Sequence, residues 1–282
     1  MMSAIVLRAV VFAIAFYGVS AALTVLFAPG LLMPYRVVLF LKQTWLHTVR
    51  WLVRRVLGIG LEIRGRGNLP DGPVILAAKH QSAWDTMGLS LLHPEAAFVL
   101  KRELMWIPLW GWYVKRMGMI PIDRAHGVAA LRNIAAIARE RVAEGRPVLI
   151  FPQGTRTAPG AKRPYLPGVA AIYTALGVPV VPVALNSGMF WPRRRFLKWP
   201  GTITVEYLEP IAPGLERRKF MRVLEARLEG ATERLEAEAA ERFPWLPAPS
   251  PAAPDRESAG AAAKTYLAAA GSSDAPPAAP SP

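Results

Sequence analysis

The sequence contains no cysteine among its 282 residues, so it forms no disulfide and offers neither a thiolate metal ligand nor a thiol nucleophile. It also lacks the Gly-x-Ser-x-Gly segment of an α/β serine hydrolase. No P-loop occurs, and Gly65-Arg66-Gly67 lacks the third glycine of a dinucleotide fingerprint. His47, His93 and His126 are not spaced as metal ligands. We therefore expect no metal and no cofactor.

Acidic residues are scarce, with 20 Asp and Glu against 34 Lys and Arg, for a net charge of +14. Such a balance favours an anionic partner, which is nucleic acid, anionic lipid or a phosphorylated substrate. Up to Pro70 the basic residues are interleaved with long apolar runs, and Glu62 is the single acid. Because nucleic-acid binders rarely combine charge with so many apolar residues, we expect a membrane partner and no nucleic acid.

Residues 9–28 carry no charge, and 20 helical residues span roughly the 30 Å of a bilayer's hydrocarbon core. A cleaved signal peptide is the alternative, with Val19-Ser20-Ala21 as the cleavage site. The apolar run continues beyond that site to Pro29-Gly30, which favours a retained anchor.

Residues 36–57 form an amphipathic pattern, with apolar residues on one face and Arg, Gln and His opposite. With 9–28 they predict a hairpin embedded in one leaflet, and a core helix is the alternative. If the first helix instead spans the membrane, the Lys and Arg excess after it places the rest of the chain on the cytoplasmic side of the inner membrane.

Beyond Pro70, short β-branched runs alternate with helical stretches, which predicts an α/β fold with a mixed, mostly parallel sheet flanked by helices. We expect three regions: membrane-anchoring helices over 1–58, the α/β domain over 59–243 and a disordered Pro/Ala-rich tail over 244–282. The expected strands are 61–64, 74–78, 97–100, 119–122, 148–151, 178–184 and 203–207. Helices are expected after Trp84 and over 128–143, 169–176 and 219–241, the last with a solvated, alternately charged face.

The segment His80-Gln81-Ser82-Ala83-Trp84-Asp85 follows a predicted buried strand. Histidine exchanges a proton near neutral pH, and a carboxylate on its second ring nitrogen fixes the tautomer and the direction of the ring. The pair predicts activation of a hydroxyl group, whereas ordinary surface or capping roles are the alternative for such a pair alone.

Three further segments end predicted strands, where α/β proteins keep their sites. They are Gly118 to Arg124, Phe151-Pro152-Gln153-Gly154-Thr155-Arg156, and Val181-Pro182-Val183 with Asn186. Arg124 and Arg156 are candidates for forked hydrogen bonds to phosphate, and Gly154 permits close backbone approach. A surface ion pair is the alternative role for either arginine.

In this order the four segments resemble the glycerolipid acyltransferase family, and specifically its bacterial 1-acylglycerol-3-phosphate acyltransferases. The resemblance covers about residues 60 to 210, with His80 and Asp85 matching the family's His-x4-Asp motif. One departure is Gln153, where the family's third motif usually has glutamate. The amide keeps an acceptor oxygen, loses the charge and gains a donor.

The resemblance implies acyl transfer from acyl-CoA or acyl carrier protein to the sn-2 hydroxyl of 1-acylglycerol-3-phosphate, giving phosphatidic acid. His80 is then the general base and Asp85 its orienter. Lys101, Arg124 and the segment Gln153, Gly154, Thr155 and Arg156 are then the substrate-binding residues. Lys101 is equally suited to the oxyanion and to phosphate.

Two other functions stay open. In the first, the protein is an acyltransferase for another lysolipid, such as lyso-ornithine lipid. The glutamine at 153 keeps this alternative open. In the second the protein is a non-catalytic basic membrane adaptor. The aromatic stretch from Met105 to Tyr113 is expected to pack in the core, with an acyl tunnel or lipid contact as alternatives.

Overall fold

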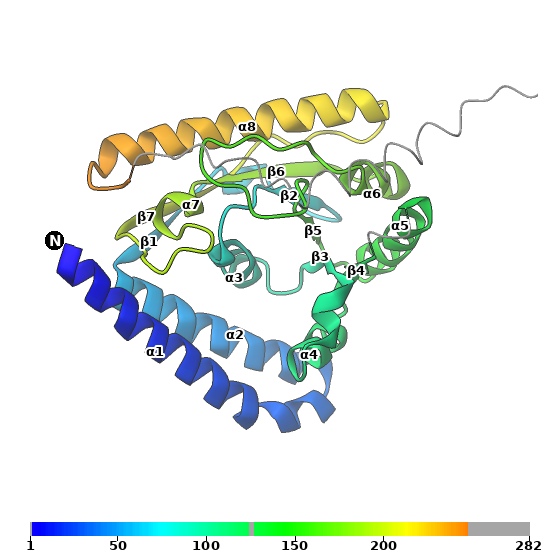
Figure 1. Cartoon of the computed structure of the whole chain (residues 1–282). Coiled ribbons are helices and arrows are strands. Elements are labelled where there is room, and N and C mark those ends of the chain that lie inside the picture. The colour runs from blue at the N-terminus through cyan, green and yellow to red at the C-terminus, as the bar shows by residue number, and fades with distance from the viewer. Residues whose placement is uncertain (1, 124–126, 248–282) are drawn as a thin grey trace, which may run out of the picture.

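A computed structural model describes residues 2–123 and 127–247 of the chain (Figure 1). Seven strands form one sheet in the order β1-β7-β6-β2-β5-β3-β4. The strands are β1 (Ile59–Arg64), β2 (Ile75–Ala78), β3 (Ala97–Lys101), β4 (Ile120–Ile122), β5 (Val148–Ile150), β6 (Val180–Leu185) and β7 (Gly201–Tyr207). Each overlaps a strand predicted from the sequence, and the mixed, mostly parallel sheet is confirmed.

The helices lie between these strands and at both ends of the described chain. They are α1 (Met2–Leu26), α2 (Tyr35–Leu52), α3 (Ala83–Leu92), α4 (Trp110–Arg116), α5 (Gly127–Ala143), α6 (Gly168–Leu176), α7 (Ser187–Phe190) and α8 (Arg217–Arg242). Short 3-10 turns η1 (Ala28–Leu32), η3 (Arg66–Asn68) and η4 (Arg102–Trp106) and a π turn η2 (Val53–Leu57) complete them. All four helices expected beyond Pro70 are present.

Strand direction gathers loops at one edge of the sheet. β6, β2, β5, β3 and β4 are parallel to one another, whereas β7 is antiparallel to β6. The carboxyl ends of these five strands therefore meet at a single edge, and the loops that follow them lie together.

Two apolar layers cover the sheet because alternate residues of a strand point to opposite faces. Leu76 and Ala78 of β2 join a cluster with residues of α1, α2 and α3, while Ile75 and Ala77 join a cluster with α5, α6 and α8. Figure 1 shows the corresponding arrangement, with α8 on one side of the sheet and the α1–α2 pair on the other.

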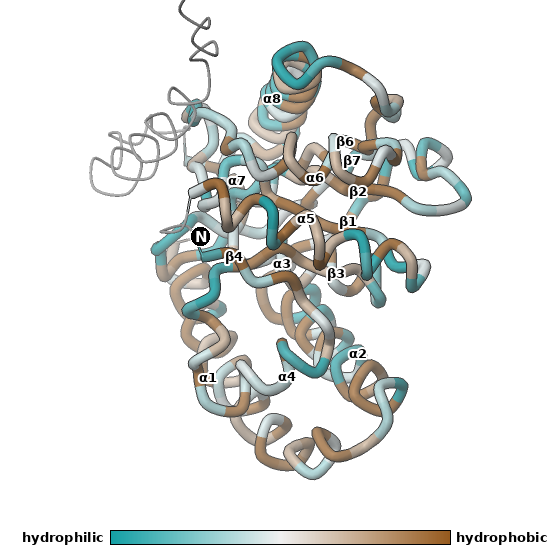
Figure 2. The backbone as a smooth tube through the Cα atoms, turned by 90° about the vertical axis from the view of Figure 1, so that its right-hand side faces the viewer, coloured by the Kyte–Doolittle hydropathy of each residue, from teal (hydrophilic) through white to brown (hydrophobic). Residues whose placement is uncertain are grey.

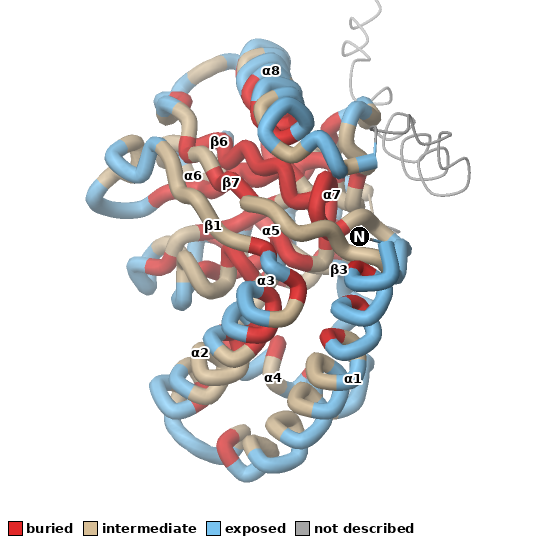
Figure 3. The backbone as a smooth tube through the Cα atoms, turned by 90° about the vertical axis from the view of Figure 1, so that its left-hand side faces the viewer, coloured by how far each residue is buried: buried red, intermediate tan, exposed pale blue. Residues whose placement is uncertain are grey.

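The two N-terminal helices form a hairpin whose first helix is mostly exposed (Figure 3). α1 has 25 residues and is long and apolar enough to cross a membrane, yet only 11% of its most apolar stretch is buried. Phe12 packs edge-on against Trp191, and Trp45 of α2 donates to the Ser20 hydroxyl of α1 at 3.0 Å. The hairpin is thus attached to the domain along one side only.

α2 has features of both a membrane-embedded helix and a core helix, the two roles considered for residues 36–57. Its Val49 and Leu52 lie in the core cluster, as a core helix requires. Phe40 and Trp51 on its other side are exposed by 68% and 59%. One side of α2 therefore packs on the domain while the other extends the apolar surface of α1.

The expected boundary at position 244 falls just before a segment that still packs on the domain. Phe243 and Leu246 contact the core, and Trp245 donates to the Pro200 carbonyl at 3.1 Å. The rest of the predicted tail, 248–282, lies outside the described residues.

One sequence expectation about burial was wrong. The aromatic stretch does not pack in the core as a unit, because Trp106 and Trp112 are exposed by 71% and 62%. The solvated face expected on α8 is present, with Glu225 and Glu233 exposed. Two other acids of the helix point inward, since Glu236 is 7% exposed and the side chain of Glu229 is 14% exposed. These acids are seven residues apart and therefore share one face of the helix.

Candidate active site

The loops after β2, β5 and β6 form the site, because these three strands are adjacent in the sheet and parallel. β2 is followed by Lys79 and His80, β5 by Phe151 to Arg156, and β6 by Asn186 and Ser187. Three of the four segments singled out in the sequence are thus brought to one place. The chain between 118 and 123 follows α4 and contains β4, at the far edge of the same sheet.

Asp85 holds His80 in a fixed orientation. The buried carboxylate of Asp85 accepts from His80 Nδ1 at 2.8 Å through Oδ2. The same oxygen accepts from the backbone N–H groups of Gln81 and Ser82 at 2.6 and 2.8 Å. Since an ionised carboxylate only accepts, Nδ1 carries the ring proton and Nε2 presents its lone pair.

Ser82 serves as the N-cap of α3. Its hydroxyl accepts from the Trp84 N–H at 3.0 Å, and Asp85 completes the capping box from the first turn. The capping box explains the local sequence, because one short turn starts the helix and aims the carboxylate at His80. The capping role foreseen as an alternative for this segment therefore coexists with the orienting role.

The His80 ring is also fixed on its flat side. It stacks on Phe151 from the loop after β5, with ring centres 4.0 Å apart and planes 17° from parallel. The His80 carbonyl accepts from the Thr157 N–H at 2.7 Å. The side chain remains 15% exposed, so the imidazole is immobilised and still open to a ligand.

Ser187 is a part of the site that sequence reasoning missed. Its hydroxyl donates a short hydrogen bond to the second carboxylate oxygen of Asp85, Oδ1. Asn186, which was singled out, instead ties β7 to α8: its side chain accepts from the Thr204 N–H and donates to the Leu235 carbonyl. The residue after the expected one therefore completes the support of the carboxylate.

Two arginines, Arg156 and Arg193, lie near Asp85. Half-buried Arg156 has its pKa lowered chiefly by burial and next by the charge of Arg193, whereas Asp85 acts in the opposite direction. Arg193 donates to the Arg156 carbonyl at 3.1 Å. Guanidinium groups that repel one another in this way favour a bound anion. No sequence signal marked Arg193, which follows α7.

The other candidate binding residues differ in position. Lys101 is the exposed last residue of β3, one strand beyond β5 at the same edge. Gly154 adopts φ of +65° in the turn after β5, where the absence of a Cβ is needed, and Thr155 follows it half-buried. Arg124 lies outside the described residues.

Gln153 is buried and points toward a polar cluster on α8. Its Nε2 lies 3.4 Å from Glu229 Oε1 of α8. The Glu229 carboxylate also pairs with Lys79 Nζ at 2.6 Å and accepts from the Tyr165 hydroxyl at 2.7 Å. Burial and the Glu229 charge raise the pKa of Tyr165. Gln153 therefore links the loop after β5 to Glu229 of α8.

A second acid of α8 supports the other side of His80. Glu236 accepts from Gln81 Nε2 at 2.5 Å and from the Gly160 N–H at 2.9 Å. Gln81 in turn accepts from the Gly188 N–H at 2.9 Å. Burial raises the pKa of Glu236. The residues on either side of His80 in the chain are thus both held by α8.

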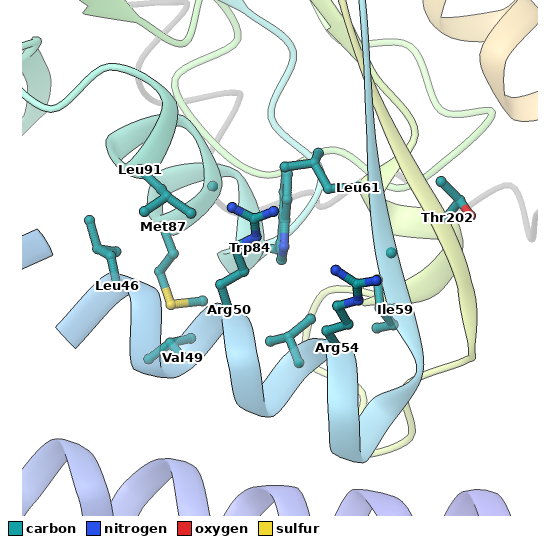
Figure 4. A pocket seen from close by; sticks show the side chains of 13 residues that line it. Leu46, Val49, Arg50, Arg54, Ile59, Leu61, Trp84, Met87, Leu91 and Thr202 are labelled. Atoms are coloured by element: carbon teal, nitrogen blue, oxygen red, sulfur yellow. The ribbon is translucent and has the colours of Figure 1, made fainter. Parts of the chain in front are cut away.

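A separate pocket of about 230 Å³ lies between α2, α3 and the β1–β7 pair. Figure 4 shows Arg50 of α2 and Arg54 of η2 reaching into it beside apolar side chains that include Trp84 and Met87. The pocket combines an apolar lining with two cations, which suits an anionic amphiphile.

Comparison with known proteins agrees with this arrangement. Residues 60–186 match the family model described as Acyltransferase. It is 40% identical over 166 residues to 1-acyl-sn-glycerol-3-phosphate acyltransferase of Pseudomonas aeruginosa, covering 59% of this chain and 65% of that protein. It is 31% identical over 169 residues to the human beta enzyme of the same name, covering 58% and 61%. The chain thus spans slightly less than two thirds of either relative.

The fold has a counterpart among solved structures. The crystal structure of the 1-acyl-sn-glycerophosphate (LPA) acyltransferase PlsC from Thermotoga maritima matches with a TM-score of 0.66 and 24% identity, covering 82% of this chain and 98% of that one. The match includes the mixed sheet flanked by helices, as predicted.

Proposed function

We propose that this chain, through its Acyltransferase domain, transfers an acyl group from a thioester to the sn-2 hydroxyl of 1-acylglycerol-3-phosphate. The observation that carries the proposal is the orientation of His80, whose Nδ1 is fixed by Asp85 while the side chain stays 15% exposed. Arg156 lies close enough for the charge of Asp85 to act on its pKa. The names of the relatives at 40% and 31% identity support the same reaction and acceptor.

In the proposed reaction, His80 Nε2 removes the proton of the acceptor hydroxyl as its oxygen attacks the thioester carbonyl. Asp85 stabilises the imidazolium that forms. The tetrahedral intermediate then collapses, the C–S bond breaks, and the thiolate takes the proton from His80. The products are the ester and a free thiol, so the imidazole returns to its starting state.

Arg156 and Arg193 bind the acceptor phosphate in this proposal, with Arg124 as a further contact and Lys101 at the phosphate or the oxyanion. Binding matters for rate because orientation of the hydroxyl against Nε2 supplies much of the barrier reduction. Gln153 acts indirectly, since its described contact is with Glu229.

The proposed location is the inner membrane, with the domain on its cytoplasmic side. The exposed apolar α1 and the basic residues that follow it support membrane attachment and this orientation. The acceptor and product are lipids, so attachment brings the site to its substrate. The apolar pocket rimmed by Arg50 and Arg54 is consistent with a lipid substrate.

The test is an acyl-transfer assay with the purified full-length protein and either radiolabelled oleoyl-CoA or radiolabelled oleoyl-acyl carrier protein as the donor. A panel of lyso-acceptors, including 1-acylglycerol-3-phosphate and lyso-ornithine lipid, identifies the acceptor. We expect His80→Ala to lose about 10²–10⁴-fold in kcat, the range for general bases. Near-normal turnover of His80→Ala refutes the mechanism, and no transfer to any acceptor favours a membrane adaptor.

A further inference from the structure

Four exposed apolar side chains follow β3 and lie outside both apolar layers of the sheet. Trp106, Ile107, Trp110 and Trp112, here called the tryptophan face, are exposed by 71%, 46%, 43% and 62%. Large apolar side chains grouped in this way on a surface mark a binding site, whereas scattered ones are ordinary.

The backbone beneath the tryptophan face is firmly packed. Gly111 is buried, and a Cβ there would lie 2.0 Å from the Met105 carbonyl oxygen. The Gly111 N–H donates to the Ile107 carbonyl at 2.7 Å, and Val114 anchors α4 in the interior. The tryptophans are therefore held outward by a fixed turn.

The tryptophan face lies beside the turn of the N-terminal hairpin. Arg116 of α4 donates to the Met33 carbonyl, just after η1, at 2.7 Å. Leu32 and Met33 in that turn are exposed by 91% and 50%. Figures 1 and 2 show α4 next to the turn that joins α1 and α2. In Figure 2 much of this hairpin is coloured as hydrophobic. The two exposed apolar groups are thus neighbours.

The charges around the tryptophan face are mainly positive. Lys115, Arg116 and Arg102 are exposed around it, and Arg36 is exposed at the start of α2. Tryptophan prefers the boundary between acyl chains and headgroups, and Lys and Arg extend toward anionic headgroups from the same depth. This combination fits a bilayer surface that contains anionic lipid.

We propose that the tryptophan face is a second membrane-binding element, which inserts at the interface of the leaflet that holds the hairpin turn. The inference rests on the membrane attachment in the proposed function and adds a consequence. A hairpin alone leaves the hairpin and the domain packed on it free to roll together about the hairpin axis in the leaflet, whereas a second contact fixes the orientation. Because α4 follows β3 at the carboxyl edge of the sheet, this contact holds the His80 edge near the lipid surface.

Single-cysteine labelling tests the proposal, because the chain has no native cysteine. Trp106→Cys and Trp112→Cys each carry an environment-sensitive fluorophore in the full-length protein, reconstituted in phosphatidylcholine vesicles with phosphatidylglycerol. Ala226→Cys is the control, because Ala226 is exposed on α8, across the sheet from the hairpin (Figure 1). Quenching by brominated lipid is compared with quenching by aqueous iodide.

We expect lipid quenching at positions 106 and 112 to exceed that at 226 several-fold, with iodide quenching in the reverse order. Iodide access equal to that of the control overturns the proposal. Shielding from both quenchers also overturns it, because the face is then covered by protein. Neither readout depends on catalysis, so the result stands apart from failure of the proposed reaction.

A paired substitution checks that the native side chains carry the effect. Trp106→Ser with Trp112→Ser is compared with Trp106→Tyr with Trp112→Tyr, which keeps interfacial aromatics. With a single-cysteine label at Met105, we expect the serine pair to lose the lipid quenching and the tyrosine pair to keep it. Equal quenching in both pairs contradicts the role of the aromatic side chains.

Discussion

The Glu229 cluster offers a charge-exchange experiment at the base of the site. One oxygen of Glu229 accepts from Lys79 Nζ at 2.7 Å and lies 3.4 Å from Gln153 Nε2. Lys79, which is 2% exposed, immediately precedes His80. In the family that the sequence resembles, the third motif usually has glutamate at the position of Gln153. We therefore predict that Gln153→Glu and Glu229→Gln are each harmful alone and compensate when combined.

Glu229→Gln leaves the buried Lys79 charge without its carboxylate. Removing one partner of a buried pair costs about 3–5 kcal/mol. At about 2–4 °C per kcal/mol, this lowers Tm by roughly 6–20 °C. We expect kcat to fall as well, because Lys79 fixes the chain entering His80.

Gln153→Glu adds a carboxylate next to Glu229. Two unit charges about 4 Å apart repel by about 4 kcal/mol at an effective dielectric constant near 20. Lys79 offsets part of this repulsion, so we expect a loss of roughly 2–4 kcal/mol. In the double variant the carboxylate at 153 becomes the partner of Lys79, and the net charge of the cluster is unchanged. The expected coupling free energy is about 3 kcal/mol.

The assay is thermal unfolding in detergent together with kcat for the four proteins. Glu233→Gln on the same helix is the matched control, because the Glu233–Lys162 pair is exposed and such pairs contribute at most about 1 kcal/mol. If the two losses simply add in the double variant, the carboxylate positions are independent and the reasoning is refuted. Restored stability without restored kcat would instead refute the link from Lys79 to His80.

Three other predictions concern separate parts of the site and fold. Ser187→Ala removes a hydrogen bond to the buried Asp85 carboxylate, so we expect the free energy of unfolding to fall by about 1.5–3 kcal/mol. We also expect kcat to fall while the acceptor KM stays the same, and an unchanged kcat contradicts this role. Arg193→Gln is expected to raise the acceptor KM roughly tenfold with the donor KM unchanged, and equal changes in both argue against phosphate binding. Burial and the Arg66 charge lower the pKa of His93 to about 4, so the unfolded chain binds the extra proton and stability falls as pH drops from about 6.5 through 4. Chemical denaturation of His93→Gln across this range is expected to show a weaker pH dependence, and an identical profile assigns the loss to other groups.

The strands of the sheet were predictable because each has a local sequence signal. Buried β-branched runs such as 180–185, which read as Val-Val-Pro-Val-Ala-Leu, are bounded by Pro and Gly and are followed by polar residues. The order of the strands is a property of distant pairing and was not predicted. The approach of His80 to Phe151 depends on that order, since β2 and β5 are neighbours only in the folded sheet.

The His80–Asp85 pair was also predictable, because both residues lie in one six-residue segment that starts a helix. Arg193 and Ser187 were not, since they reach the site only through the turns after β6. The tryptophans were placed wrongly because an aromatic run gives no sign of whether it faces the interior or the outside. Which tryptophans of α4 are exposed depends on which side of the helix packs inward, and that side carries Gly111 and Val114.

The α8 acids show most clearly where sequence reasoning ends. An alternately charged helix is typical of a solvated surface, and Glu233 conforms to that pattern. Glu229 and Glu236 depart from it because Lys79 and Gln81, more than 140 positions earlier, present buried donors to the same face. A glutamine at 153 is compatible with this arrangement because its amide donates to a carboxylate that another helix supplies. We therefore interpret the glutamine at 153 as a change in the position of the buried carboxylate, which α8 supplies through Glu229. The substitution does not by itself argue for a different acceptor.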